Sequence, residues 1–397
     1  MSGPLHGIRV IEIGTLIAAP FAARLMAEFG ADVIKIEAPE TGDPLRKWRK
    51  LHEGTSLWWY LQSRNKQSVC VNLKSPEGVE IVKQMVAEAD VLIENLRPGA
   101  LEKLGLGWDT LHALNPKLTM VRISGYGQTG PYRDRPGFGA IGEAMGGIRY
   151  TTGEIDGAPA RVGVSLGDSL ASLHGVIGAL MSLLRVKTGQ GEGQVVDVSL
   201  VESVFNLMES LVPEYDLLGH VRERSGGALP GIAPSNTYRT EDGAFVVIAG
   251  NSDPIFRRLM HTIGRPDLAD DPALAHNDGR VGQTAMLDAA IAAWTSHHSI
   301  DDVLAALERA EVPSGRIYSV ADIVGDPHYR ARDMLLPATL PGGASVAMPG
   351  IVPKLSDTPG GMHWPGPALG EHTSSVLAGL GYGEDEIARL REQGAVQ

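Results

Sequence analysis

Two kinds of hydrophobic pattern alternate along the first half of the chain. Short, continuous apolar runs predict buried β-strands at 8–13, 33–37, 90–94 and 118–124. Longer stretches with apolar residues three or four positions apart predict helices at 16–29, 76–89 and 108–115. Because strands and helices alternate regularly, we expect an α/β fold with a Rossmann-like, doubly wound sheet.

The middle of the chain continues this pattern and then departs from it. A short apolar strand ending at Gly167 is expected before a long helix, 170–186, whose faces are mostly apolar and are therefore expected to be buried. A strand at 194–200 follows, and then a helix to about residue 211. A Gly- and Pro-rich segment, 225–235, predicts a loop where the pattern changes.

The remaining segments predict a second, more helical region. The expected elements are a strand at 244–249, helices at 253–263, 284–294 and 299–310, and a C-terminal helix at 384–393. We therefore expect three parts: a large domain over 1–215, a smaller α+β domain with its linkers over 216–325, and a return segment over 326–397 that completes the large domain.

Composition and charge exclude several classes of function. The 397 residues carry a net charge of −12, which argues against a nucleic-acid or membrane-surface partner. We find no signal sequence and no uncharged apolar run of about 18 residues, and so expect a cytoplasmic protein without a membrane span. The single cysteine, Cys70, lies in an apolar run and is expected to be a buried strand thiol.

Common cofactor motifs do not occur. The first turn between a strand and a helix, 14–20, lacks the Gly-x-Gly-x-x-Gly pattern that brings a backbone close to a dinucleotide, and no Walker-type phosphate loop is found. The adjacent pair His297 and His298 cannot share one helix face, so we expect no metal site there. A basic cluster, 46–50, fits either a solvated loop or an anion site at the end of a strand.

Asp168 is the strongest candidate for catalysis. It lies between an apolar run and a long helix, where backbone N–H groups and the helix dipole favour negative charge. An ionised carboxylate in this position can attack a thioester carbonyl and form a covalent intermediate. The same residues also fit a simple helix N-cap. A third interpretation is a serine esterase with Ser169 as nucleophile, with Asp109 and His112 as a preceding pair.

The chain resembles the family III CoA-transferases, the group that includes formyl-CoA transferase and the carnitine CoA-transferases. Eight segments carry the resemblance in order: 4–10, 29–37, 64–66, 89–95, 125–131, 166–168, 187–191 and 369–373. The resemblance implies that Asp168 attacks the acyl-CoA donor, giving an aspartyl anhydride and then an aspartyl-CoA thioester. It also implies an interlocked homodimer, CoA as substrate and product, and no metal or other bound cofactor.

The resemblance further implies a set of CoA contacts in four loops and at one basic position. These contacts fall on Leu16, Ile17, Ala18, Val71, Lys74, Asn95, Leu96, Arg97, Lys103, Gly137, Phe138 and Gly139. The Gly-rich segment 225–231 lies where some relatives have a mobile loop over the intermediate.

Departures from the family pattern narrow the expected reaction. Formyl-CoA transferase has glutamine where this chain has Ile17 and arginine where it has Ala38, so we do not expect a formyl-CoA and oxalate pair. General similarity to the family implies small dicarboxylates, such as succinate and an unsaturated or branched relative. Three arginines are candidate partners of a distal carboxylate: Arg46, Arg149 and Arg161. The alternatives are a racemase of 2-methylacyl-CoA, although residues 137–139 lack the histidine base it needs, and a non-catalytic CoA-binding relative.

Overall fold

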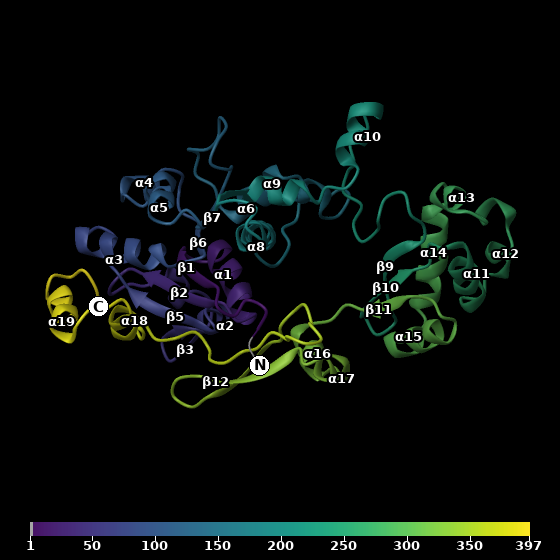
Figure 1. Cartoon of the computed structure of the whole chain (residues 1–397). Coiled ribbons are helices and arrows are strands. Elements are labelled where there is room, and N and C mark those ends of the chain that lie inside the picture. Colours follow the sequence, from purple (N-terminus) through teal and green to yellow (C-terminus); the bar gives the residue numbers. More distant parts are fainter. Residues whose placement is uncertain (1–2) are drawn as a thin grey trace. The chain divides into compact units, whose positions relative to one another are not determined.

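The computed structural model describes residues 3–397, which divide into two compact units (Figure 1). Unit 1 holds the chain up to Ile148 together with Val162–His220 and Ala331–Gln397. Unit 2 holds Arg149–Arg161 and Val221–Arg330. These divisions lie near the domain limits expected at 215 and 325. The expected domains stay predictions, because a compact unit need not fold alone.

Unit 1 contains a six-stranded parallel sheet with the strand order β5-β2-β1-β6-β7-β8. The strands are β1 (Arg9–Ile13), β2 (Asp32–Glu37), β5 (Lys66–Cys70), β6 (Val91–Glu94), β7 (Thr119–Ser124) and β8 (Val195–Ser199). All five neighbouring pairs run parallel, which confirms the expected α/β class and doubly wound sheet. The strands are short and mostly apolar because both faces of the sheet are covered, although β2 and β5 also carry the buried lysines Lys35 and Lys66.

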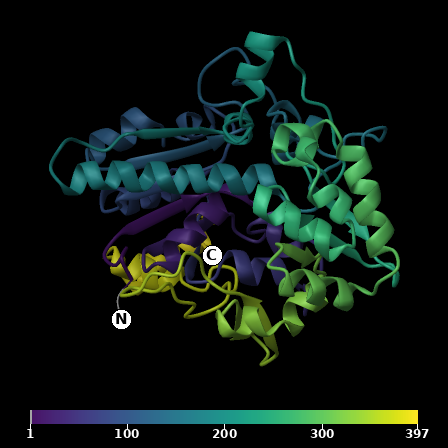
Figure 2. The ribbon, with the colours of Figure 1, turned by 90° about the vertical axis from the view of Figure 1, so that its right-hand side faces the viewer.

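Two hydrophobic cores lie on the two faces of this sheet. Successive side chains of a strand point to opposite faces, so Val10 packs with one core and Ile11 with the other. The first core contains helices α1 (Ala18–Glu28) and α8 (Leu166–Lys187), and Figure 2 shows α8 lying along the strands. The second core contains α3 (Pro76–Ala87), α5 (Trp108–Leu114), α18 (Thr373–Gly379) and α19 (Glu384–Glu392).

The last part of the chain closes unit 1 at the β5 edge. It forms a hairpin, β12 (Leu335–Thr339) and β13 (Ser345–Pro349), and then an extended run that leads to α18 and α19. Val396 pairs antiparallel with Val71, and the Asn72 N–H donates to the Ala395 carbonyl at 2.8 Å. The C-terminal residues therefore lie beside the carboxyl end of β5.

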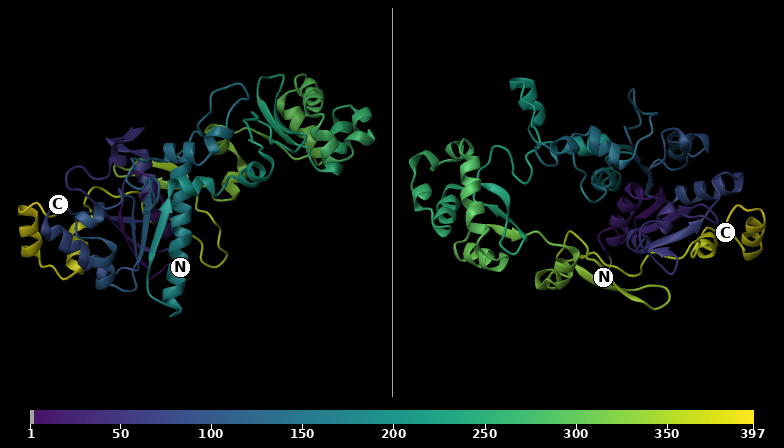
Figure 3. Two further views of the ribbon diagram at one scale, coloured as in Figure 1. Left: turned by 90° about the horizontal axis from the view of Figure 1, so that it is seen from above. Right: turned by 180° about the vertical axis from the view of Figure 1, so that it is seen from behind.

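Unit 2 is built on a small antiparallel sheet with the order β11-β10-β9 (Figure 3). Its strands are β9 (Ser235–Arg239), β10 (Phe245–Ala249) and β11 (Ser314–Arg316). Its main helices are α11 (Asp253–Thr262), α14 (Thr284–Thr295) and α15 (Ile300–Arg309), which share one core with the sheet.

Short elements complete the two units. Those at the start of the chain are η1 (Pro44–Lys47), β3 (Leu51–His52), β4 (Thr55–Ser56), α2 (Leu57–Gln62) and α4 (Ala100–Lys103). Those around α8 are α6 (Gly139–Met145), α7 (Ile148–Thr151), α9 (Leu200–Phe205) and α10 (Leu211–Leu218). The rest are α12 (Pro266–Ala269), η2 (Pro272–Leu274), α13 (Asn277–Val281), α16 (Val320–Gly325) and α17 (Pro327–Ala331).

Three local predictions are wrong. The residues before Asp168 form no strand, and α8 begins at Leu166 rather than after the aspartate. The helix after β8 ends at Phe205, and α10 is a separate helix. The helix expected to be buried, α8, has a buried side that includes Ala171, Ala179 and Leu183 and an exposed apolar side. By length and composition, α8 is also the one helix within residues 3–397 that could cross a membrane.

Candidate active site around Asp168

Asp168 is the third residue of α8, so it lies inside the first helical turn and is not the N-cap. The cap position is Ser165, whose side chain makes no capping hydrogen bond. A carboxylate in the first turn still lies beside N–H groups that have no helical partner, and the helix dipole stabilises its charge. Asp168 is partly buried, which keeps it accessible to a ligand while removing part of its water.

The esterase interpretation does not fit the surroundings of Ser169. The Ser169 hydroxyl donates to the Ser165 carbonyl at 2.8 Å, the usual use of a serine inside a helix. His112 stacks on Trp108 and lies 3.3 Å from Glu192. Because α5 and α8 cover opposite faces of the sheet, the structure does not bring Ser169 and His112 together.

The loop 137–139 and Asp168 are in close contact. A Cβ atom on Gly139 would lie only 2.1 Å from Asp168 Oδ2, so the carboxyl group rests directly against this glycine. Gly137 is packed in the same way against Gly125, just after β7, where an added Cβ would meet the Gly125 Cα at 2.8 Å. Phe138, between the two glycines, is 68% exposed.

A buried carboxylate helps to hold the start of α8 in this contact. Glu143, on α6, is fully buried and accepts a hydrogen bond from the Gly167 N–H at 3.3 Å. Gly167 is itself packed against the Gly139 carbonyl, 2.9 Å from an ideal Cβ. The start of α8 and the start of α6 are therefore fixed against each other on both sides of Asp168.

A second link joins Asp168 to the first loop of the sheet. The Ser172 hydroxyl lies 2.7 Å from the Asp168 carbonyl and 2.7 Å from the Ala18 carbonyl. Ser172 is fully buried, and Ala18 is the first residue of α1. The segment Leu16, Ile17 and Ala18 is thus held close to the start of α8.

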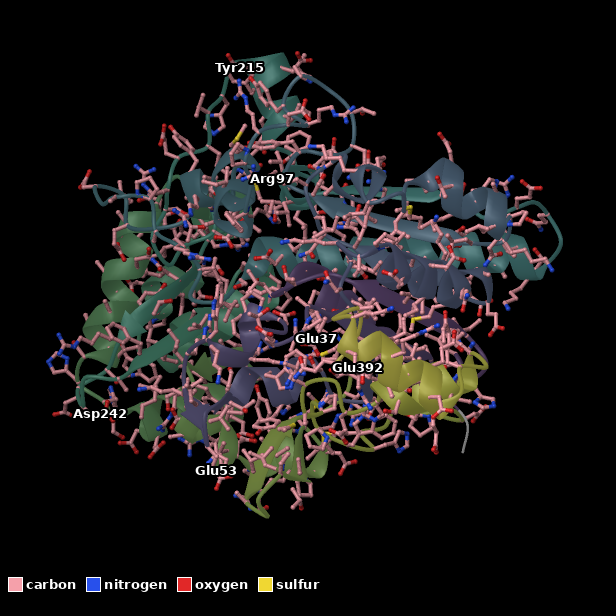
Figure 4. The ribbon with its side chains drawn as sticks, turned by 90° about the vertical axis from the view of Figure 1, so that its left-hand side faces the viewer. Glu37, Glu53, Arg97, Tyr215, Asp242 and Glu392 are labelled. Carbon is pink, nitrogen blue, oxygen red and sulfur yellow. The ribbon has the colours of Figure 1, made fainter. Side chains whose placement is uncertain are left out.

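The other expected CoA-binding residues gather at the same edge of the sheet. Val71 and Lys74 follow β5, and Asn95, Leu96 and Arg97 follow β6. The carboxyl ends of parallel strands meet at one edge, where open α/β sheets bind their ligands. Lys74, Arg97 and Lys103 are exposed, so their charges are available to an anion. Figure 4 labels Arg97 together with Glu37, the last residue of β2.

A cleft of about 810 Å³ opens between the end of β2, the end of β5 and the C-terminal tail. Residues from all three segments line it, among them Ala38, Asn72, Lys74, Arg391, Val396 and Gln397. Figure 4 labels Glu37 and Glu392, the chain neighbours of two of these lining residues. Sequence reasoning found Lys74 but missed Arg391, because nothing local connects α19 to the end of a strand 300 residues earlier.

Beneath the site lies a network of buried charges. Lys35 Nζ contacts Glu12 at 2.6 Å and Asp43 at 2.9 Å, and Lys66 Nζ contacts Glu12 at 2.7 Å. Burial opposes ionisation of Asp43, but the charge of Lys35 and the hydrogen bonds from Lys35 and from the Leu45 and Leu16 N–H groups together outweigh it and lower the pKa of this carboxyl group. For Lys66 burial prevails over the attraction of Glu12 and lowers its pKa to about 8.

Arg46 belongs to this buried framework and corrects one expectation. Its guanidinium pairs with Glu37 at 2.7 Å, donates to the Pro367 carbonyl and lies over the Trp59 ring. Burial opposes ionisation of Glu37, yet the hydrogen bonds from Arg46 lower its pKa. Arg46 is therefore neither part of a solvated loop nor available to a substrate carboxylate. The other two candidate arginines, Arg149 and Arg161, belong to unit 2.

Within residues 3–397, no group of three histidine, cysteine, aspartate or glutamate side chains is arranged to hold a metal ion. Cys70 is buried, and burial raises the pKa of its thiol to about 11, so it is not a nucleophile at neutral pH.

Comparisons with known proteins give a consistent result. Residues 5–373 match the family described as CoA-transferase family III. The chain is 49% identical over 390 residues to the succinyl-CoA–D-citramalate CoA-transferase of Chloroflexus aurantiacus, covering 98% of this chain and 97% of the relative. It is 44% identical to the beta subunit of that organism's succinyl-CoA–L-malate CoA-transferase, covering 98% and 97%. The crystal structure of a CAIB/BAIF family protein from Brucella suis superimposes with a TM-score of 0.84 at 35% identity, covering 96% and 100%.

Proposed function

The chain belongs to CoA-transferase family III, and we propose that it moves CoA from succinyl-CoA to a second small dicarboxylic acid. The donor is inferred from relatives whose names specify succinyl-CoA. D-citramalate and L-malate, named for the same relatives, are the acceptors to test first. Ile17 supports a pocket for a partly apolar acid, since it places no polar group in the first loop.

The observation that carries the proposal is the contact between Asp168 and Gly139. A carboxylate at the first turn of a helix is stabilised as an anion, and the missing side chain of Gly139 lets this carboxyl group lie directly against the backbone at the start of α6. Residues 137–139 carry no histidine that could remove an α-proton, so the arrangement favours attack by the carboxylate over racemisation.

Each step of the proposed reaction exchanges one acyl bond for another. An Asp168 oxygen attacks the thioester carbonyl of succinyl-CoA, the C–S bond breaks, and CoA leaves as a thiolate. The thiolate then attacks the aspartyl carbonyl of the anhydride, which releases succinate and leaves an aspartyl-CoA thioester. The acceptor carboxylate displaces CoA from this thioester, and the thiolate finally attacks the acceptor's carbonyl. The last step forms the new acyl-CoA and restores the Asp168 carboxylate.

The proposal is tested with Asp168→Ala and Asp168→Asn. Both variants should abolish exchange of labelled succinate into succinyl-CoA while the protein stays folded. Hydroxylamine added with succinyl-CoA should convert Asp168 of the native chain into a hydroxamate that mass spectrometry locates. Asp109→Ala is the matched control, since Asp109 is an exposed carboxylate in the first turn of α5. Full exchange activity in Asp168→Ala would contradict the proposal.

We also propose that the chain works as a homodimer, which the exposed apolar side of α8 supports. Leu173, Ile177, Leu180, Met181 and Leu184 recur at helical spacing on this side and are each more than 40% exposed. A contiguous apolar surface of this kind marks a surface that is covered in the working protein. Assembly would cover it with a second copy of the chain, and the cytoplasmic location stays a prediction.

A further inference from the structure

The backbone of residues 14–17, the loop between β1 and α1, is held by side chains at every residue. Each contact is a hydrogen bond from a different part of unit 1. Lys35 Nζ donates to the Gly14 carbonyl at 2.8 Å, and Gln62 Nε2 donates to the Ile17 carbonyl at 3.1 Å. The Asn95 amide bonds to both Thr15 N and Thr15 O at 2.9 Å, and Asp43 Oδ1 accepts the Leu16 N–H at 3.0 Å. Lys35, Asp43 and Gln62 are buried, so these bonds are shielded from water.

The loop needs this support because Leu16 is in a strained conformation. Its φ angle is +66°, in the left-handed region that a branched apolar side chain disfavours. Strain of this kind persists only where the surroundings over-determine the backbone, and it concentrates at functional sites. Asp43 is the group that opposes relaxation most directly, because its carboxylate accepts the Leu16 N–H while Lys35 holds it from the other side.

Asn95 holds the loop from the opposite direction. Its amide accepts the Thr15 N–H and donates to the Thr15 carbonyl, so both polar ends of the side chain are used on the loop. The Asn95 Oδ1 atom also fills the space where a Gly14 side chain would begin, 2.8 Å from an ideal Cβ. Both ends of the Asn95 amide are therefore engaged by the loop backbone.

The held loop is linked to the proposed nucleophile. Ser172 joins the Ala18 carbonyl, directly after the loop, to the Asp168 carbonyl. A displacement of the loop would therefore be passed through Ser172 to the first turn of α8, which carries Asp168. When the loop and the first turn of α8 are fixed before the substrate binds, the nucleophile is aligned with the carbonyl carbon that it attacks.

We propose that Asp43 and Asn95 are positioning residues that keep Leu16 in its left-handed conformation, so that the backbone of loop 14–17 holds the acyl-CoA thioester in line with Asp168. The inference rests on the proposed function, because it assumes transfer at Asp168. Neither Asp43 nor Asn95 is proposed as a ligand of CoA, because both act through the backbone of the loop.

The test is a double-mutant cycle. Asp43→Asn should lower kcat for CoA exchange by about tenfold or more, because a misplaced loop costs alignment. Glycine adopts a positive φ without strain, so in Leu16→Gly the loop no longer needs the Asp43 carboxylate to keep its conformation. In the Leu16→Gly background, Asp43→Asn should therefore lower kcat by a clearly smaller factor. Equal factors in both backgrounds would overturn the proposal, since loss of general stability is not rescued by relief of one φ angle.

A second pair of variants covers the case in which Asp43→Asn does not fold. Asn95→Ala should lower kcat and slow hydroxamate formation at Asp168 by the same factor. Asn115→Asp is its matched control, because the Asn115 amide also donates to backbone carbonyls, those of Val86 and Ala89, but at the end of α5. The control should lower the melting temperature without changing kcat well below it. Unchanged kcat in Asn95→Ala would overturn the inference.

The outcome separates this inference from the proposed function. If the native chain exchanges label and forms the hydroxamate but the cycle shows no coupling, only the positioning role fails. If the native chain binds CoA in calorimetry yet forms no hydroxamate with any donor, the transfer mechanism itself fails.

Discussion

Gly139 lies so close to Asp168 that only a hydrogen atom fits at its side-chain position while the carboxyl group stays in place. Nothing larger fits, because a methyl group at residue 139 would overlap the carboxyl oxygen at 2.1 Å. The φ angle of Gly139 is not in the left-handed region, so a substitution there tests space and not backbone strain.

We expect Gly139→Ala to lower kcat by about 100-fold with little loss of stability, because the carboxylate must move aside. Gly163→Ala is the control, since a Cβ at Gly163 would meet nothing within 4 Å. Exchange assays and thermal unfolding of the two variants check the prediction. Equal kcat in both would show that the observed contact is not the reactive geometry.

Buried carboxylates should set the acid limit of stability. The pKa values of Glu37 and Asp43 lie below their usual values of 4.5 and 3.8, although burial alone would raise them, because Arg46 and Lys35 favour the charged forms. For such groups the stabilisation is complete above the unfolded pKa and is lost as pH falls through the folded pKa. Stability should therefore hold from pH 7 to about 5 and fall steeply below about 4.

The prediction is checked by thermal unfolding at pH 7, 5, 4 and 3.5. Glu37→Gln should be less stable at pH 7, because Arg46 is left buried without its partner, and should show a shallower acid decline. Glu88→Gln, which alters an exposed ion pair with Arg9, should follow the native curve. An identical acid decline in Glu37→Gln would contradict the prediction.

At the level of residues, the sequence indicated candidates but not their contacts. Asp168 and Gly139, which the family resemblance suggested for separate roles, lie against each other, whereas Gly137 packs against Gly125. Arg46 was misjudged because its partner Glu37 lies at the end of a different element, and a buried ion pair leaves no periodic signal. Ser172 was missed because a serine inside an apolar helix also fits simple packing.

At the level of elements, the cleft between β5 and α19 leads to a prediction about the nucleotide end of CoA. Lys74 and Arg391 bring two positive charges to a cleft of about 810 Å³, which Glu40 also lines, and Ala38 leaves space where formyl-CoA transferase has an arginine. We expect the 3′-phosphate of CoA to bind there, with Arg391 supplying the missing charge.

Arg391→Gln should raise KM for succinyl-CoA by about tenfold, the value of a hydrogen bond to a charged group, and leave kcat unchanged. With succinyl-dephospho-CoA, which lacks the 3′-phosphate, native chain and variant should show the same KM. Arg389→Gln is the control on the same helix, since Arg389 faces Glu386 and does not line the cleft. A tenfold effect that persists with the dephospho substrate would place the phosphate elsewhere.

Some elements could be predicted from the hydrophobic pattern of the sequence, and others could not. Most strands of the sheet were predictable because burial on both faces makes them short apolar runs. For β5 the sequence indicated only a strand around Cys70, since Lys66 and Gln67 begin the strand with polar side chains. The strand expected before Asp168 was wrong, since four or five apolar residues do not distinguish a strand from an irregular segment. The pairing of Val396 with Val71 could not be foreseen, because a single bridge between distant residues has no period.

At the level of the whole molecule, α8 carries both the proposed nucleophile and the proposed dimer surface. Its first turn carries Asp168, and further along the same helix an apolar side is exposed. The sequence predicted a helix buried on most faces, and the single chain buries only one of them. A second copy would resolve this difference, since an apolar surface in a dimer interface behaves like a buried core.

Interface variants on α8 should therefore change the mass in solution. Met181 and Leu184 are each 66% exposed, and Met181→Glu with Leu184→Glu would place two charges in an apolar interface. We expect light scattering to give twice the 42.2 kDa chain mass for the native protein and a shift toward one chain for the double variant. Leu114→Glu, at an isolated exposed leucine on α5, should remain a dimer. A native protein that elutes at the mass of one chain, or that requires detergent to stay in solution, would show that α8 is covered by something other than its own copy.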